Sequence, residues 1–244
     1  MLRERNTILY PPHTHTELQN CNVDRCWRDV AIFFLLFFLL YIIDIMTDVL
    51  SRIKQPRPYA GNAMHIPRAA QLKARSLCWQ FNHCDPADVA RQHDVLMRLF
   101  GTYHGSVYLM PEFHCDFGFN IHFKGFALVN YNCVMLDTSP IVIGRSVLLG
   151  PGVVLACAGH PLDPGQRKSG AYETSAPITI ADNVWIGANT TVCGGVEIGE
   201  GSVIGAGSVV NKNIPAGVLA AGVPCKLLRQ LNSADKLDAS AFEF

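Results

Sequence analysis

Apolar residues recur every six positions along residues 178–215, without a break. The residues at this spacing are Ile180, Ile186, Val192, Ile198, Ile204 and Val210. The residue after each of them is mostly small, and an amphipathic helix does not have a period of six. The repeat therefore predicts a parallel β-helix, in which each unit supplies one short strand and one turn. A Val- and Gly-rich β-sandwich, the alternative, would alternate with a period of two.

The repeat is less regular between residues 117 and 155. Two runs keep the six-residue spacing, but the second run is shifted by two positions. The runs are Phe123, Val129 and Met135, followed by Ile143, Leu149 and Leu155. Extra residues near 137–140 are therefore expected to bulge from the coil. Between residues 155 and 180 the repeat is interrupted, and such an interruption usually forms a loop on the functional face of a repeat protein.

Two amphipathic helices are expected within residues 66–100, before the coils. Pro67 suits the first position of one helix, and Asp85 and Pro86 suit the cap and start of the other. The apolar positions that follow the turns are Leu72, Trp79, Val89, Leu96, Leu99 and Phe100. Residues 60–105 would then cover the open strand edges of the first coil.

The β-helix is expected to occupy residues 110–230. Its last part, 216–230, contains a Gly-Val-Pro corner that should lead into a short basic helix. Residues 231–244 are expected to be a frayed C-terminal tail. The overall fold class is thus mainly β, with a small helical cap and an additional N-terminal hydrophobic helix.

Residues 1–55 form an N-terminal extension with an extremely hydrophobic segment at 30–50. The stretch 30–43 carries no charge, whereas a membrane span needs about 20 apolar residues. Extending the stretch to residue 50 includes Asp44 and Asp48, which are unfavourable in lipid. A transmembrane helix and an interfacial or docked helix both remain open. A cleaved signal peptide is not expected, and the expected location is cytoplasmic, with or without a membrane tether through 30–50.

Composition excludes some classes of protein. The 244-residue chain has a formal net charge of zero, which argues against a nucleic-acid-binding surface. Its nine cysteines are scattered and form no CxxC motif. Free thiols in a reducing compartment are a better interpretation than disulfides or a zinc site.

His160 is the one histidine in the loop that interrupts the repeat. Pro161 follows it and disfavours helical geometry at His160. The imidazole pKa lies near neutrality, which suits removal of a proton from an alcohol that attacks a carbonyl group. The candidate partners of His160 are four polar residues: Asn130, Asp137, Asp163 and Glu173.

Several motifs together resemble one known family. They are QFNHCDPADV at 80–89, NYNCVMLD at 130–137, GHPLDP at 159–164, PITIADNVWIGANTTV at 177–192, GVEIGEGSVIGAGSVVNKNIP at 195–215 and AAGVPCKLLR at 220–229. The chain is similar here to the maltose, galactoside and nodulation-type O-acetyltransferases, hexapeptide-repeat enzymes with a left-handed parallel β-helix. The resemblance implies transfer of an acetyl group from acetyl-CoA to a hydroxyl, typically of a sugar, without a metal. It also implies a homotrimer that holds acetyl-CoA between neighbouring prisms.

The resemblance implies a role for individual residues. His160 matches the catalytic base, and the backbone N–H of Ala188 matches the donor to the oxyanion. The residues that match acceptor-binding positions are Asp116, Asn130, Asp137 and Glu173. The residues that match cosubstrate-binding positions are Trp185, Ala188, Ala206, Asn211, Lys212, Lys226 and Arg229.

The chain departs from the family pattern at three positions. Asn62 lies near the place of an acidic residue, Gln71 near that of an arginine, and Lys124 where glycine is usual. Two other functions remain open: a non-catalytic β-helix scaffold, and a zinc hydratase on the same prism. The hydratase would need its zinc ligands from His114, His122 and His160.

Overall fold

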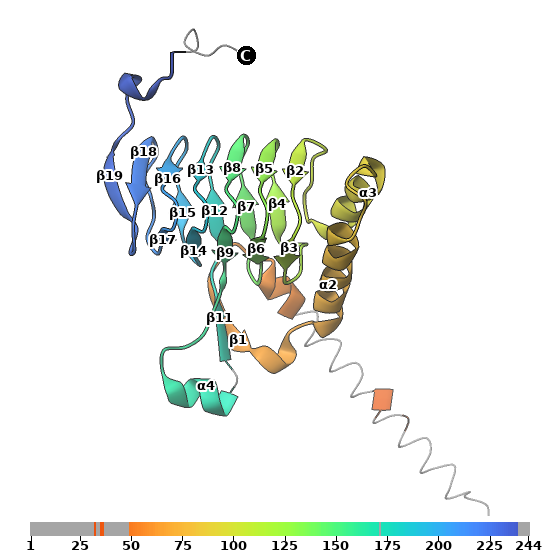
Figure 1. The fold of residues 1–244 in the computed structure, drawn as a ribbon. Coiled ribbons are helices and arrows are strands. Elements are labelled where there is room, and N and C mark those ends of the chain that lie inside the picture. The colour runs from red at the N-terminus through yellow and green to blue at the C-terminus, as the bar shows by residue number, and fades with distance from the viewer. Residues whose placement is uncertain (1–31, 33–34, 37–48, 171, 239–244) are drawn as a thin grey trace, which may run out of the picture. The chain divides into compact units, whose positions relative to one another are not determined.

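The computed structural model describes residues 32, 35–36, 49–170 and 172–238. Within the unit Met46–Phe244, three parallel sheets run along a single coiled column, because successive strands belong to successive sheets (Figure 1). Each coil thus contributes one strand to each sheet. The parallel β-helix predicted from the six-residue repeat is confirmed.

We number the three sheets for reference. Sheet 1 contains β2 (Val107–Leu109), β5 (Ala127–Val129), β8 (Val147–Leu149), β13 (Trp185–Ile186), β16 (Val203–Ile204), β18 (Val218–Ala221) and the antiparallel β19 (Lys226–Gln230). Sheet 2 contains β3 (Phe113–Cys115), β6 (Cys133–Leu136), β9 (Val154–Ala156), β14 (Thr191–Cys193) and β17 (Val209–Val210). Sheet 3 contains β4 (Ile121–Phe123), β7 (Ile141–Ile143), β12 (Ile178–Ile180) and β15 (Glu197–Ile198).

The corners of the coil are named edge 1–2, edge 2–3 and edge 3–1 after the sheets they join. The first coils are longer than the later ones: Val107 pairs with Ala127, twenty positions on, whereas Trp185 pairs with Val203, eighteen positions on. The additional residues lie at edge 2–3, where residues 116–120 and 137–140 link sheet 2 to sheet 3. The bulge predicted near 137–140 is therefore confirmed.

The column is filled by the aliphatic residues of the repeat. Ile186, Val192 and Ile204 have no exposed surface, and the residue beside each core position faces outward. Period-two alternation within each short strand fixes which side chain enters the core. Among the described residues, these core side chains and the buried side chains of the helical cap form one continuous hydrophobic cluster.

Two helices cover the first coil, α2 (Arg68–Asn82) and α3 (Val89–Leu99). The Asn82 side chain completes the edge of β3, since its Nδ2 donates to the carbonyl of Phe113 and its Oδ1 accepts from the Phe113 N–H. An amide side chain thus replaces a neighbouring strand, which is how an open sheet edge is satisfied.

The helix details differ from the sequence-based expectation. Helix α3 is capped by Asp88, whose carboxylate accepts from the Arg91 N–H, and not by Asp85. Residues Leu72, Trp79 and Val89 are exposed. The buried face of α2 consists instead of Ala74, Leu77, Cys78 and Phe81, because contact with the first coil, and not the largest apolar side chains, selects the buried face.

The prediction of a short basic helix after the Gly-Val-Pro corner is wrong, because residues 226–230 form strand β19. This strand pairs antiparallel with β18. The last coil leaves unpaired backbone groups on β18, and satisfying them outweighs the modest helix preference of Lys-Leu-Leu-Arg-Gln.

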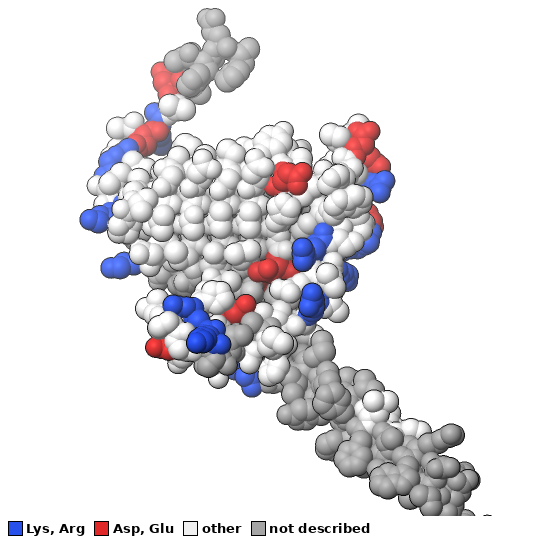
Figure 2. All heavy atoms as spheres, turned by 60° about the horizontal axis from the view of Figure 1, so that its bottom comes forward, with Lys and Arg blue, Asp and Glu red and all other residues white. Residues whose placement is uncertain are grey.

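A further antiparallel sheet projects from edge 2–3. It contains β1 (Tyr59–Asn62), β11 (Tyr172–Ser175) and β10 (Ala158–Gly159), and the short helix α4 (Pro164–Gly170) lies at its end (Figure 1). Two 3₁₀ turns, η1 (Ala63–His65) and η2 (Ser233–Asp235), complete the elements. On the face that Figure 2 shows, charged side chains gather around this projection and at the ends of the column, and much of the surface between them is uncharged.

Most of the hydrophobic segment 30–50 lies outside the described residues. Residues 49–53 are helical, and the side chain of Ile53 is buried. Among the described helices, none has the length and hydropathy that crossing a bilayer requires.

Candidate functional site

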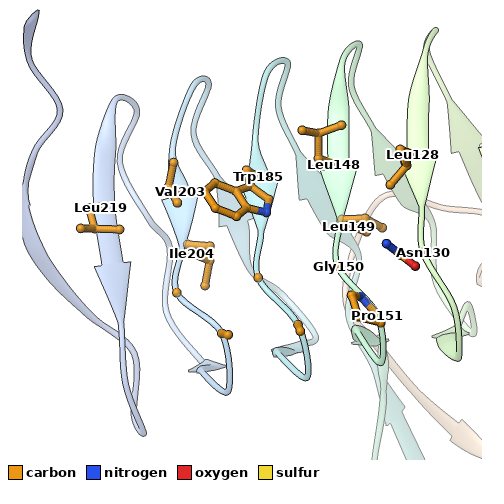
Figure 3. A pocket seen from close by; sticks show the side chains of 14 residues that line it. Leu128, Asn130, Leu148, Leu149, Gly150, Pro151, Trp185, Val203, Ile204 and Leu219 are labelled. Atoms are coloured by element: carbon orange, nitrogen blue, oxygen red, sulfur yellow. The ribbon is translucent and has the colours of Figure 1, made fainter. Parts of the chain in front are cut away.

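An open groove of about 760 Å³ runs along sheet 1 beside edge 1–2 (Figure 3). Its wall is a ladder of outward-facing residues on adjacent strands: Leu128, Leu148, Trp185, Val203 and Leu219. The Trp185 side chain is about half exposed. The groove is therefore a long apolar surface, which suits an extended and partly apolar ligand.

Small residues bring the backbones of successive coils close together at the floor of the groove. A Cβ atom at Gly150 would lie 2.7 Å from the nitrogen of Ala188, and one at Gly187 would lie 2.6 Å from the nitrogen of Ala206. Both distances are shorter than side chains tolerate. Glycine at these two positions is what keeps the two nitrogens accessible.

The N–H of Ala188 has no acceptor among the described residues. The adjacent N–H groups are bonded, that of Gly187 to the Ile204 carbonyl and that of Asn189 to the Pro151 carbonyl. Pro151 occupies the equivalent position in the preceding coil and has no N–H to offer. The predicted donor at Ala188 is thus an unpaired N–H that lines the groove.

His160 lies at the end of β10, on the projecting sheet. Its Nδ1 is 3.2 Å from the carbonyl oxygen of Tyr172 on β11. A carbonyl can only accept, so Nδ1 carries the proton and Nε2 presents a lone pair. The imidazole is exposed, which leaves Nε2 accessible to a ligand.

The loop after His160 is held by its own hydrogen bonds. The Arg167 guanidinium donates to the carbonyls of Pro161 and Leu162 at 2.6 and 2.8 Å. The Asp163 carboxylate accepts from the Gln166 N–H at the start of α4. Asp163 therefore braces the loop at the start of α4.

Three of the predicted acceptor residues gather near edge 2–3. Burial raises the pKa of Asp116, and the nearby charge of Glu173 raises it further. The Asp137 carboxylate is fully buried and accepts from the N–H groups of Asp116, Phe117 and Asn120. Burial raises its pKa to about 7, although those hydrogen bonds oppose the shift. The carboxylate thus holds the backbone of the widened corner that carries Asp116, and the predicted contact of Asp137 with the acceptor stays a prediction.

Asn130 is the one predicted acceptor residue that lies at edge 1–2, where it lines the groove. Its Oδ1 accepts from the Tyr131 N–H. Asn211 and Lys212 follow β17 of sheet 2 and so lie at edge 2–3, apart from Ala188 and Ala206. The structure therefore divides the predicted site between two edges, separated by sheet 2, whose strands β3, β9 and β14 have three residues each and are about 10 Å long.

The last two predicted cosubstrate residues belong to β19. Lys226 is exposed, whereas the Arg229 guanidinium is paired with the Asp235 carboxylate through two hydrogen bonds of 2.8 and 2.6 Å. This pairing lowers the pKa of Asp235 to about 2. Arg229 would have to share or leave this partner to bind a phosphate.

Sequence reasoning did not predict the hydrogen bonds that hold edge 2–3 in place. The buried Asn120 side chain donates to the carbonyls of Ile53 and Asp137. The Tyr59 hydroxyl donates to the Thr138 carbonyl, and burial raises the Tyr59 pKa to about 12. These contacts join residues 67 and 79 positions apart, and no local sequence pattern reports them.

Within the described residues, no three His, Cys, Asp or Glu side chains converge as metal ligands do. His114 and His122 lie on the outer faces of sheets 2 and 3, respectively, and His160 lies on the projection. The ligand set that a zinc hydratase needs is therefore not assembled by these three histidines.

Comparison with known proteins identifies two family models in the chain. Residues 177–212 match the model described as bacterial transferase hexapeptide (six repeats). Residues 62–105 match the maltose acetyltransferase hexapeptide capping motif. The chain is 40% identical to galactoside O-acetyltransferase of Escherichia coli over 185 residues, which is 76% of this chain and 90% of that protein. It is 42% identical to a putative acetyltransferase of Saccharomyces cerevisiae, over 72% of this chain and 88% of that protein.

Solved structures show the same similarity. A galactoside acetyltransferase in complex with coenzyme A superposes with a TM-score of 0.71 at 37% identity, covering 78% of this chain and 94% of the other. A hexapeptide-repeat acetyltransferase of Vibrio cholerae in complex with acetyl-CoA gives a TM-score of 0.69 at 35% identity, covering 76% and 99%.

Proposed function

Because the chain belongs to the hexapeptide-repeat O-acetyltransferase family that includes the galactoside and maltose enzymes, we propose that it transfers acetyl from acetyl-CoA to a hydroxyl of a sugar or sugar-like acceptor. That the chain is an O-acetyltransferase follows from its family. The single observation that carries the proposal is the groove of sheet 1, which is lined by the unpaired N–H of Ala188.

His160 is the general base of the proposed reaction. The Tyr172 carbonyl holds the proton on Nδ1, so Nε2 takes the proton of the acceptor hydroxyl as its oxygen attacks the thioester carbon. The imidazolium that forms later returns this proton to the departing CoA thiolate. The acetyl group moves directly to the acceptor, and no acyl-enzyme is required.

The Ala188 N–H stabilises the tetrahedral intermediate. The negative charge that develops on the former carbonyl oxygen needs a fixed donor, and an N–H without another partner meets that need without rearrangement. Trp185 and the apolar ladder hold the pantetheine arm in the groove, and the Ala206 N–H lies one coil further along it. Asn211, Lys212, Lys226 and Arg229 are assigned to the nucleotide end of the cosubstrate.

A homotrimer is the assembly we propose, because the site is divided between two edges of one chain. Edge 1–2 offers the groove and Asn130, and edge 2–3 offers His160, Asp116 and Glu173. A cyclic arrangement of prisms places edge 2–3 of one subunit opposite edge 1–2 of the next. Each site then takes its base from one subunit and its oxyanion donor from another.

The acceptor is proposed to be a polyhydroxylated molecule held by Asp116, Asn130 and Glu173. Carboxylate and amide oxygens accept hydrogen bonds from hydroxyl groups, which suits a sugar. Asp137 fixes the backbone at Asp116 and so acts on the acceptor indirectly.

The test is a thiol-release assay of the full-length chain with acetyl-CoA and a panel of mono- and disaccharides. The expected result is CoA release that depends on the acceptor and yields one acetylated sugar with an alkali-labile ester. Acetyl-CoA binding without transfer to any hydroxyl compound would contradict the proposal and favour the scaffold alternative. An alkali-stable amide product would show that the acceptor group is an amine.

A further inference from the structure

A second hollow of about 490 Å³ lies where the N-terminal extension joins the catalytic unit. It is lined by Ser51, Arg52, Gln55, Arg57, Pro58 and Tyr59. Two guanidinium groups and several neutral polar groups therefore surround one cavity, away from the groove of sheet 1. Arginine pairs of this kind suit phosphate oxygens, because each guanidinium presents a planar set of donors.

The hollow is fixed to the β-helix at both of its ends. The Ile53 side chain is buried, and its carbonyl accepts from the Asn120 Nδ2 at 3.0 Å. The Tyr59 hydroxyl is bonded to the Thr138 carbonyl at 2.8 Å. Lys54 lies between these two anchors, with its ammonium 5.0 Å from the centre of the Phe119 ring. Arg57 is thus carried by a short segment that is anchored on both sides, and Arg52 directly precedes the first anchor.

Negative charge limits where an anion can sit. The carboxylates of Glu173 and Asp116 contribute to the raised pKa of Tyr59, after the larger effect of burial. The Tyr59 end of the hollow therefore faces negative charge. A phosphate is therefore expected against Arg52 and Arg57, and not at the Tyr59 end.

The sequence around the hollow identifies the occupant. Only Ser51 separates Arg52 from the hydrophobic segment 30–50, whose first fourteen residues carry no charge. A free phosphate needs no such neighbour, whereas basic residues beside an apolar segment are the usual arrangement for contact with anionic lipid. The galactoside O-acetyltransferase match covers 76% of this chain and 90% of that relative. The match to the maltose acetyltransferase capping motif begins at residue 62, so the hollow precedes it in the sequence.

We propose that the hollow formed by residues 51–59 binds the phosphate of an anionic phospholipid headgroup and so seats the catalytic unit on a membrane surface. This site is separate from the acetyl-transfer site. Its location beside β1 matters for function, because Asn62 of β1 pairs with Tyr172, which holds His160. Docking would bring the acceptor loop close to the membrane surface.

The test measures flotation of the full-length chain with vesicles of phosphatidylcholine alone and of phosphatidylcholine with 30% phosphatidylglycerol. We expect tighter binding to the anionic vesicles and a loss of that preference at high salt. Arg52→Gln combined with Arg57→Gln should weaken binding to anionic vesicles roughly 30-fold, since each basic residue near such a surface contributes about fivefold. The exposed pair Arg75→Gln and Arg91→Gln removes the same charge from the helical cap and should have little effect.

Three outcomes would overturn the proposal. Equal binding to both kinds of vesicle would show that apolar residues act alone. Equal losses in the two double variants would show a net-charge effect without a site. Saturable binding of glycerol phosphate, with no preference for anionic vesicles, would assign the hollow to a soluble phosphate compound. Acetyl transfer to a soluble acceptor should be unchanged in both double variants, so failure here is distinguishable from failure of the proposed enzymatic activity.

Discussion

Edges 1–2 and 2–3 are corners of the same coils, yet they provide chemistry by different means. Edge 1–2 is built from Gly150, Gly187 and Ala188, and it offers an unpaired backbone N–H on the floor of an apolar groove. Edge 2–3 has longer corners and a projecting sheet, and it offers side chains, among them His160 and Asp116. One edge depends on the absence of side chains, and the other depends on their presence.

The difference follows from the length of the coil. In the eighteen-residue coils the backbone has no spare length, so successive corners stack closely and only small residues fit. In the twenty-residue coils the additional residues at edge 2–3 make space for a buried carboxylate and its hydrogen-bonded backbone. The tight corner therefore suits a donor that must not move, and the widened corner suits specificity for an acceptor.

The largest expected effect of a single change is on edge 2–3. His160→Ala should lower kcat about 100- to 10,000-fold, the usual contribution of a general base. Acetyl-CoA affinity should remain nearly unchanged, because the groove lies on the other edge. The measurements are steady-state transfer and a separate titration with acetyl-CoA. His104→Ala, an exposed histidine between the cap and the first strand, is the control, and a wild-type rate in His160→Ala would contradict the base assignment.

The next largest effect should come from a change at edge 1–2. Unlike His160→Ala, it should lower the affinity for acetyl-CoA. Gly187→Ala places a Cβ 2.6 Å from the Ala206 nitrogen, so the floor of the groove must shift. We expect acetyl-CoA to bind at least about tenfold more weakly and the free energy of unfolding to fall by about 1–3 kcal/mol. Gly105→Ala is the matched control, because its nearest contact would be an ordinary 3.4 Å. Unchanged acetyl-CoA affinity at a normal unfolding temperature would show that the floor is not part of the site.

The two edges were also unequally predictable from the sequence. The apolar period of six identified the coils, and the small residues after Ile186 and Ile204 identified edge 1–2, because both are local patterns. At edge 2–3 the pattern predicted the loop that interrupts the repeat, the bulge near 137–140 and the position of His160 in that loop. The contact of Ile53 with Asn120 joins distant parts of the chain and leaves no periodic signal. The same reason explains why β19 was predicted as a helix: an open strand edge nearby in space, and not the residues themselves, selects the strand.

A smaller effect is expected from the buried carboxylate of edge 2–3. The Asp137 pKa is raised to about 7 in the folded protein, above about 3.9 in an unfolded chain. The folded state therefore holds the proton more tightly, and this contribution to stability is complete below about pH 4 and lost as the pH rises through 7. Asp137→Asn cannot ionise, so its stability relative to wild type should improve between pH 4 and pH 8 by up to about 4 kcal/mol. Urea unfolding across this range measures the difference.

Asp85→Asn, an exposed carboxylate beside α2, is the control for that comparison and should run parallel to wild type. Parallel curves for Asp137→Asn as well would show that the carboxylate stays ionised in the folded protein. In that case the corner would be held by charge-assisted hydrogen bonds from the N–H groups of Asp116, Phe117 and Asn120.

The smallest effect is expected at edge 3–1, which carries none of the described residues that are assigned to the proposed site. There the Asp182 carboxylate accepts from the Arg145 N–H and pairs with its guanidinium at 2.8 Å. Surface ion pairs contribute little, because solvent and salt screen them. Asp182→Asn should leave acetyl transfer and acetyl-CoA affinity unchanged and should lower the unfolding temperature less than Gly187→Ala does. Kinetics and thermal unfolding of the two variants side by side provide the measurement. A loss of activity in Asp182→Asn comparable with that of Gly187→Ala would mean that all three edges transmit strain equally, and the contrast between a backbone edge and a side-chain edge would then have no functional basis.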